Sequence, residues 1–314
     1  MDIETIITGI GERGNRAIAK AISLVEDGAP EAERLLASLD AEPIDRAMVM
    51  GITGAPGAGK STLTDKLIAH CREQNKRVGV IGVDPSSPLT GGAIHGDRVR
   101  MMQHALDEDV VIRSMATRGR LGGLCASAGA VARIMAASGC DPVIIETVGV
   151  GQSEMDIIRI ADVTALVSAP GLGDDIQALK AGLLEVADIM VVNKADKPGA
   201  EMLALELQEV ARAKGGEVLM TTASKGEGVE KLSDTMEDIF GKNRASGESE
   251  RRRELSRRME IVDWCLEMLR PEIKALAGQE SRDYGDPRIK AQAIVEGLLG
   301  NLPHRGGEPK QPGE

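Results

Sequence analysis

Aromatic residues are nearly absent from this sequence, which has one Trp, one Tyr and one Phe among its 314 residues. Apolar residues nevertheless make up 42% of the chain, so the core must be built from Ile, Val, Leu, Ala and the 14 Met. This composition is typical of an α/β protein whose strands are buried on both faces. The length suits one large domain with appendages, or two small domains.

Several features that would indicate another class of protein are also missing. The 4 cysteines are far apart and form no CxxC pair, so we expect reduced thiols and a cytoplasmic location. We see no signal peptide, and no run of 18 apolar residues predicts a membrane span. The net charge of −11 offers no electrostatic drive toward nucleic acid. The one basic cluster, at Arg251–Arg253, Arg257 and Arg258, is interpreted as a solvated helix face.

The first two thirds of the chain alternate between helical and extended patterns. Residues 1–45 are expected to form an N-terminal helical extension, with one helix ending at Asp27-Gly28 and another, over 31–39, closed by Pro43. Residues 46–243 alternate short apolar runs with helical stretches, which predicts βαβ units and a mostly parallel central sheet. The expected strands are 47–53, 78–84, 109–114, 142–147, 163–169, 189–193 and 217–221.

The C-terminal part reads as a helical arm over 244–301, entered through a polar linker at 241–254. Its apolar residues recur at spacings of 4-3-4-3, namely Leu255, Met259, Val262, Leu266 and Leu269. Two heptads of this kind fit either a dimer seam or a helix docked on its own domain. Pro271 is expected to break or redirect the helix, and Asp286-Pro287 to begin the last one. The tail, 302–314, is expected to be disordered.

A phosphate-binding loop is predicted directly after the first strand. Gly54–Ser61 matches the pattern GxxxxGK[ST] and precedes a helix expected over Ser61–His70. Glycines let backbone amides turn inward around a phosphate, and the helix N-terminus adds a positive field. Lys60 would reach the β- and γ-phosphates. The nucleotide-binding residues predicted here are Gly54, Ala55, Pro56, Gly57, Ala58, Gly59, Lys60, Ser61 and Thr62.

Carboxylates follow two of the apolar strands. Glu146 ends the run Val143–Ile145, and Asp84 ends the strand at 78–84. Ligands of open α/β sheets bind at this edge, so Glu146 can hold Mg²⁺ directly or through water, and the Gly149 N–H could reach a γ-phosphate. Asp97 starts a helical run and is either a metal ligand or an N-cap. The predicted metal ligands are Ser61, Asp84, Asp97 and Glu146.

A guanine-binding motif follows the strand at 189–193. The motif is Asn193-Lys194-Ala195-Asp196, in which a carboxylate can accept hydrogen bonds from guanine N1–H and N2–H₂. Adenine lacks this arrangement of donors, so unpaired polar groups would reject it. Thr222, Ala223 and Ser224 follow the last strand and are expected to close over the base. The loop, the acids and this motif together predict a site for GTP, hydrolysed to GDP.

The chain resembles the MeaB/ArgK family, the GTPases associated with methylmalonyl-CoA mutase, from about Asn15 to about Gly300. The segments that carry the resemblance are Gly51–Thr62, Val83–Pro88, Gly96–Arg98, Glu146–Glu154 and Asn193–Asp196. It implies a P-loop NTPase fold and a chaperone of an adenosylcobalamin-dependent acyl-CoA mutase. Such proteins gate cofactor loading, protect the mutase from inactivation and form homodimers through the C-terminal arm. No nucleic-acid or membrane partner is expected.

The resemblance also implies three mobile segments and an additional catalytic residue. The segments would be 85–97, 146–154 and 171–180, and Lys180 matches a family lysine implicated in partner-stimulated hydrolysis. The next residue is Ala181, where the family often has a second lysine. Asp97 and Glu146 match family residues near the metal. The catalytic candidates are therefore Lys60, Asp97, Glu146 and Lys180.

Three other functions remain open from sequence. A metallochaperone GTPase of the nickel-insertion type would need a Cys/His metal site, for which His70-Cys71 is the only adjacent pair. A small-molecule P-loop kinase would share the phosphate loop but would not need the guanine motif. An interaction module could hold nucleotide without turning it over.

Overall fold

The structure is a computed structural model that describes residues 1–84, 104, 106–116, 123–147, 153–172, 183–212, 216–280 and 286–300. The chain divides into two compact units, Met1–Asp263 and Trp264–Glu314. No described helix is long and apolar enough to cross a bilayer. Asp97, Gly149 and Lys180 lie outside the described residues, as does the tail.

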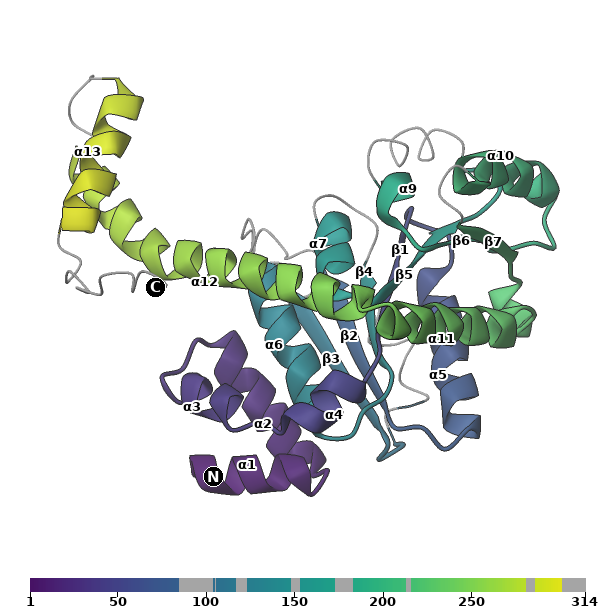
Figure 1. Cartoon of the computed structure of the whole chain (residues 1–314), viewed down its shortest axis with the longest axis horizontal. Helices are drawn as coiled ribbons and strands as arrows, with labels where there is room; N and C mark the ends of the chain where they lie inside the picture. The colour runs from purple at the N-terminus through teal and green to yellow at the C-terminus, as the bar shows by residue number, and fades with distance from the viewer. Residues whose placement is uncertain are drawn as a thin grey trace, which may run out of the picture. The chain divides into compact units, whose positions relative to one another are not determined.

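A seven-stranded, all-parallel sheet forms the centre of the first unit, in the order β3-β2-β4-β1-β5-β6-β7 (Figure 1). The strands are β1 (Val49–Gly54), β2 (Val78–Asp84), β3 (Val110–Ala116), β4 (Val143–Thr147), β5 (Val163–Ser168), β6 (Ile189–Val192) and β7 (Glu217–Met220). Every residue of β4, β5 and β6 is buried, as expected for central strands covered on both faces. The predicted α/β fold with a parallel sheet is therefore confirmed.

Helices cover both faces of the sheet. On one face, α5 (Lys60–Glu73) and α11 (Val229–Ala245) pack on side chains of β1, β4 and β5. On the other, α6 (Gly123–Ala137) and α7 (Ser153–Ile160) pack on β2 and β4. Two further helices, α9 (Leu183–Val186) and α10 (Ala200–Arg212), enclose a smaller core over β5 and β6. The crossovers leave the carboxyl ends of all the strands at one edge.

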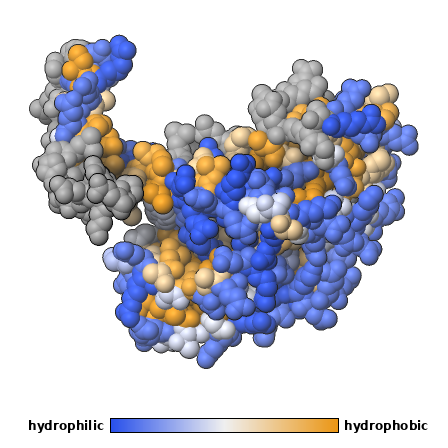
Figure 2. Space-filling view, in the orientation of Figure 1, coloured by the Kyte–Doolittle hydropathy of each residue, from blue (hydrophilic) through white to orange (hydrophobic). Residues whose placement is uncertain are grey.

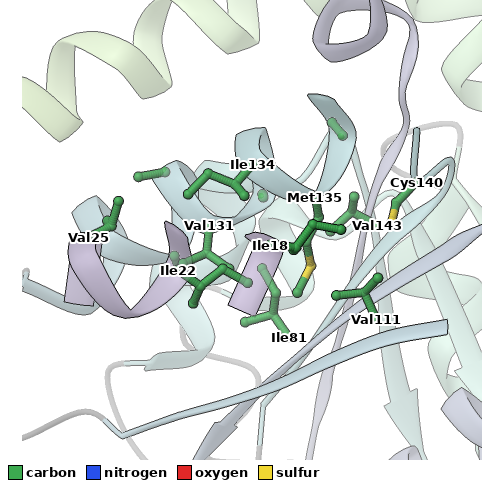
Figure 3. Packing of buried hydrophobic residues seen from close by; sticks show 14 of the residues in the cluster. Ile18, Ile22, Val25, Ile81, Val111, Val131, Ile134, Met135, Cys140 and Val143 are labelled. Carbon is green, nitrogen blue, oxygen red and sulfur yellow. The ribbon is translucent and has the colours of Figure 1, made fainter. Parts of the chain in front are cut away.

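Four N-terminal helices add a layer on α6: α1 (Ile3–Gly11), α2 (Asn15–Glu26), α3 (Glu31–Ala37) and α4 (Ala41–Arg46). Three apolar side chains of α2, those of Ile18, Ile22 and Val25, belong to one buried cluster with Val131, Ile134 and Met135 of α6 (Figure 3). The prediction that Pro43 closes a helix is wrong, because Pro43 lies in the first turn of α4. A proline fits there because the first N–H groups of a helix have no intrahelical partner.

The C-terminal helices differ from the prediction in two places. The expected linker at 241–254 is wrong, because α11 continues to Ala245 and α12 (Glu248–Glu280) begins three residues later. Its charged side chains pair along the helix instead, as Arg258 does with Glu254. Pro271 lies inside α12 without ending it. The last helix, α13 (Pro287–Gly300), begins where expected, and the Asp286 carboxylate accepts the backbone N–H of Arg288 over 2.9 Å.

The first turns of α12 are fixed by ion pairs. The Arg253 guanidinium binds both oxygens of the Asp162 carboxylate at 2.7 Å and also donates to the carbonyls of Asp45 and Ala47. Arg252 donates to Asp188 over 2.9 Å. The interpretation of this basic cluster as a solvated face is therefore wrong for these two arginines. No described apolar side chain of α12 is fully buried, and charged contacts, including the pair of Glu260 with Arg133 at 2.7 Å, contribute much of its attachment.

The same carboxylates also fix the starts of strands. Asp162 Oδ2 accepts the N–H of Val49, the first residue of β1, over 2.9 Å. Asp188 Oδ2 accepts the N–H of Thr164 in β5 at the same distance. Each carboxylate thus joins a strand start to an arginine of α12, and its hydrogen bonds offset part of the cost of removing it from water.

We predict that Arg253→Met lowers the free energy of unfolding by about 3 kcal/mol, because it leaves the Asp162 carboxylate buried without its cation. Chemical denaturation would measure the change. The matched control is Arg251→Met, since Arg251 lies on the same helix with its side chain 80% exposed, and its one ion pair among the described residues is with Glu248 of that helix. The control should change stability by about 0.5 kcal/mol or less. Equal losses in the two variants would contradict the assigned anchor.

Candidate functional site

The carboxyl ends of β1, β4 and β6 bring three predicted segments together. Gly54 ends β1, Glu146 is the next-to-last residue of β4, and Asn193 directly follows β6. Ligands of parallel sheets bind at this edge, where loops leave from adjacent strands. Segments that are far apart in the sequence therefore share one site, as their positions after apolar strands predict.

The phosphate loop is shaped by its glycines. Gly54, Gly57 and Gly59 have φ values of +138°, +76° and +92°, which side chains disfavour. A β-carbon at Gly54 would lie 2.0 Å from the carbonyl oxygen of Val167, and one at Gly59 would lie 2.4 Å from Asn193 Nδ2. Only glycine fits these two positions. These backbone conformations suit a loop that turns amides toward an anion at the N-terminus of α5.

Lys60 is buried within this loop, at 5% exposure. Its ammonium donates to the carbonyl oxygens of Gly54 at 2.7 Å and Ala55 at 2.9 Å. These bonds hold a positive charge across the mouth of the loop. A charge fixed there would stabilise the β- and γ-phosphates of a bound nucleotide.

Ser61 and Glu146 form the oxygen pair that suits a magnesium ion. Ser61 Oγ donates to Glu146 Oε1 over 2.5 Å, and both residues are buried. Hydroxyl and carboxylate oxygens are the hard donors that Mg²⁺ prefers, and Mg²⁺ usually takes its other ligands from phosphate and water. Among the described residues there is no cluster of three His, Cys, Asp or Glu side chains that could hold a metal alone. The pair therefore fits a metal completed by the nucleotide.

Asn193 joins the guanine motif to the phosphate loop. Its amide nitrogen donates to the Ala58 carbonyl over 2.9 Å. Its amide oxygen accepts the Thr221 hydroxyl and the Ala223 backbone N–H, each at 3.1 Å. Lys194 Nζ adds a bond to the Gly57 carbonyl at 2.7 Å. Hydrogen bonds thus connect the motif to both the loop after β7 and the phosphate loop.

The remaining predicted residues take different positions. Asp196 is exposed, so its carboxylate is available to a base, whereas Thr222 and Ala223 are buried beneath the motif. Asp84 ends β2, but its side chain is not among those described. Thr221 was missed from sequence, although a threonine at the end of a strand and next to a predicted base loop is the signal that could have found it.

Comparison with known proteins agrees with this geometry. Residues 18–277 match the model of the family described as methylmalonyl-CoA mutase-associated GTPase MeaB. The chain belongs to the MeaB family. It is a P-loop GTPase and, as its relatives' names indicate, a GTP hydrolase.

Individual relatives cover nearly the whole chain. A putative GTPase of Pyrococcus abyssi is 40% identical in an alignment that covers 95% of this chain and 97% of that protein. The GTPase ArgK of Escherichia coli is 36% identical over 83% of this chain and 82% of its own. The crystal structure of an LAO/AO transport system kinase aligns with a TM-score of 0.66 at 24% identity, over 95% of this chain and 97% of that one, which supports the fold.

We predict that Asn193→Ala weakens GTP binding by at least about tenfold, which corresponds to roughly 1.4 kcal/mol. The substitution removes the bonds that align the phosphate loop with the guanine motif. Titration with a fluorescent GTP analogue would measure the affinity. Asn243→Ala is the control, because Asn243 lies on α11 and is not among the residues of the site. Unchanged affinity in Asn193→Ala would contradict the role given to this side chain.

Proposed function

We propose that this MeaB-family GTPase is a chaperone of an adenosylcobalamin-dependent acyl-CoA mutase such as methylmalonyl-CoA mutase, which it serves by gating cofactor loading and preventing inactivation. The observation that carries the proposal is the family match over residues 18–277, since the family is named for its association with that mutase. A GTP site of this kind would supply the switch that such a role needs. Loops held by γ-phosphate and Mg²⁺ relax upon hydrolysis.

The proposed hydrolysis uses the residues of this site to position and neutralise charge. Lys60 would hold the β- and γ-phosphates, and Ser61 and Glu146 would hold Mg²⁺, with Asp97 as a further candidate ligand. When bound, Mg²⁺ supplies charge neutralisation between the phosphates. Phosphoryl transfer depends on positioning and electrostatic stabilisation more than on a strong base. Binding of the partner would bring Lys180 of this chain to the phosphates, where its positive charge would add to the stabilisation of the transition state.

We also propose a homodimer joined by the C-terminal arm. Four of the five seam residues that the sequence predicts are exposed on α12, with Leu255 at 60%, Val262 at 57%, Leu266 at 51% and Leu269 at 40%, whereas Met259 is half-buried. Figure 2 shows apolar surface on this helix. The heptad spacing of the seam residues would place them on one stripe of the helix. A second copy of the arm would remove this apolar surface from water.

The nickel-insertion alternative gains no support from the one adjacent His-Cys pair. Burial is the main cause that raises the pKa of the Cys71 thiol to about 11, and the thiolate is the form that binds metal. His70 instead lies 3.0 Å from the side-chain amide of Gln74. A mutase chaperone is therefore the function that we favour.

Our test of the chaperone role compares GTP hydrolysis with and without the purified cobalamin mutase of the same organism. We predict that the mutase raises the rate at least several-fold, and that Lys180→Ala abolishes the rise while nucleotide affinity stays unchanged. Lys197→Ala is the control, because Lys197 is an exposed lysine of the same unit. Equal rates of GTP hydrolysis with and without the mutase would count against the chaperone role and leave the GTPase assignment intact.

We predict that Asp196→Asn weakens GTP binding by about a hundredfold, because the guanine N2–H₂ group loses its acceptor. Xanthosine triphosphate carries a carbonyl at that position, so the amide introduced by the substitution should bind it better than the carboxylate does. Competition titrations with GTP, ATP and xanthosine triphosphate would measure both changes. A variant that keeps the original preference for GTP over ATP would contradict the assignment of Asp196 as the residue that recognises guanine.

A further inference from the structure

A buried pair of hydroxyl groups lies next to the residues that suit Mg²⁺. Thr147 Oγ1 and Thr53 Oγ1 are 3.1 Å apart, with the Thr147 hydroxyl donating, and both residues are 0% exposed. Thr53 immediately precedes Gly54 at the start of the phosphate loop, and Thr147 immediately follows Glu146. Neither threonine was predicted as a site residue, and neither can reach solvent.

The bond between the two hydroxyl groups lies one residue beyond the last backbone pair of β1 and β4. The ladder between β1 and β4 runs from Val49↔Val143 to Ile52↔Glu146. One residue further on, Thr53 pairs with β5 and Thr147 pairs with β2, each on the far side from the other. The hydroxyl bond therefore continues the β1–β4 contact where both strands run into the nucleotide site.

The pair acts from the face of the sheet opposite to the metal ligands. Successive side chains of a strand point to opposite faces, so Thr147 points away from the face that Glu146 occupies. Glu146 faces α5, where its carboxylate meets Ser61. Rotation of the end of β4 would move the Glu146 carboxylate away from Ser61, and the bond between Thr147 and Thr53 opposes that rotation.

We propose that Thr53 and Thr147 are positioning residues for GTP hydrolysis, whose hydroxyl bond sets the separation of the P-loop strand from the strand that bears Glu146. Ser61 and Glu146 are thereby presented together to one Mg²⁺. This inference rests on the metal role proposed for those two residues. Because both side chains are fully buried, Thr53 and Thr147 would act through the strands that they join and not by direct contact with nucleotide or metal.

A purely structural role would not need hydroxyl groups at this place. Burying a hydroxyl costs free energy that its hydrogen bond only offsets, and two apolar groups of the same shape can replace a bonded pair at almost no net cost. Two valines would have the required shape. The double substitution keeps the packing of the two side chains but removes the hydrogen bond between them. Its effects on hydrolysis therefore report on the hydrogen bond.

The experiment uses full-length Thr53→Val, Thr147→Val, the double variant and Thr147→Ser. Each single valine leaves a buried hydroxyl unpaired, so both should unfold at lower temperature than the unaltered protein, whereas the double variant should recover most of the loss. The double variant should still show a kcat about tenfold lower, because small displacements of catalytic groups are costly. It should also need about fivefold more Mg²⁺ for half-maximal binding of a fluorescent GDP analogue, while binding in EDTA and the KM for GTP stay close to those of the unaltered protein. Thr147→Ser keeps the hydroxyl and should restore both properties.

Thr64→Val is the matched control. Thr64 lies buried on α5, close to the phosphate loop in sequence, and its hydroxyl has no partner among the described residues. Removing it should leave kcat and the Mg²⁺ requirement unchanged. Normal kcat and Mg²⁺ dependence in the double variant would overturn this inference alone. If nucleotide binding by the unaltered protein did not depend on Mg²⁺, the metal role of Ser61 and Glu146 would fail, and this inference with it.

Discussion

The contact between Asn193 and the phosphate loop is the interaction on which the nucleotide site depends most. Gly59 approaches the Asn193 amide so closely that a β-carbon would come within 2.4 Å of its nitrogen. The same amide also holds Ala58 on one side and the loop after β7 on the other. The segments predicted to bind phosphate and guanine are therefore joined by one hydrogen-bonded side chain, and a change at the predicted guanine motif should also alter the phosphate loop. Such preorganisation reduces the ordering that nucleotide binding must otherwise impose.

The polar contacts of the sheet lie at the two ends of its strands, and the interior between these ends is apolar. At the carboxyl edge lie the phosphate loop, Glu146 and the guanine motif, and at the opposite edge Asp162 and Asp188 accept strand N–H groups. The interior between the edges is packed by aliphatic residues and Met, which explains how the protein folds almost without aromatic residues. Its one phenylalanine, Phe240, lies at the boundary of the core, with the Arg253 guanidinium 5.7 Å from its ring centroid.

The sequence predicts best what depends on local pattern. All seven strands are found within about two residues of their predicted bounds, because buried parallel strands are continuous apolar runs. The juxtaposition of Ser61 and Glu146 also follows, since Glu146 lies at the carboxyl end of β4 and Ser61 follows the loop at the carboxyl end of the adjacent strand β1. The contact between Arg253 and Asp162 joins residues 91 positions apart, and no pattern marks either as a partner. The hydrogen bond between Thr221 and Asn193 likewise could not be predicted from sequence, because no pattern marks the two residues as partners.

The errors in the C-terminal part have a common physical cause. A run rich in Arg, Glu, Ser and Gly reads as a linker when each residue is judged alone, yet i,i+3 and i,i+4 ion pairs favour a helix. Two of its arginines then find carboxylates at the sheet edge, and the helix is fixed by charge instead of apolar burial. Four of its five heptad-spaced apolar residues are exposed, and only Met259 among them is half-buried. Salt screens ion pairs at partly exposed sites but does not weaken apolar association. The attachment of α12 to its own sheet and the association proposed for its apolar stripe must therefore respond differently to ionic strength, although one continuous helix carries both.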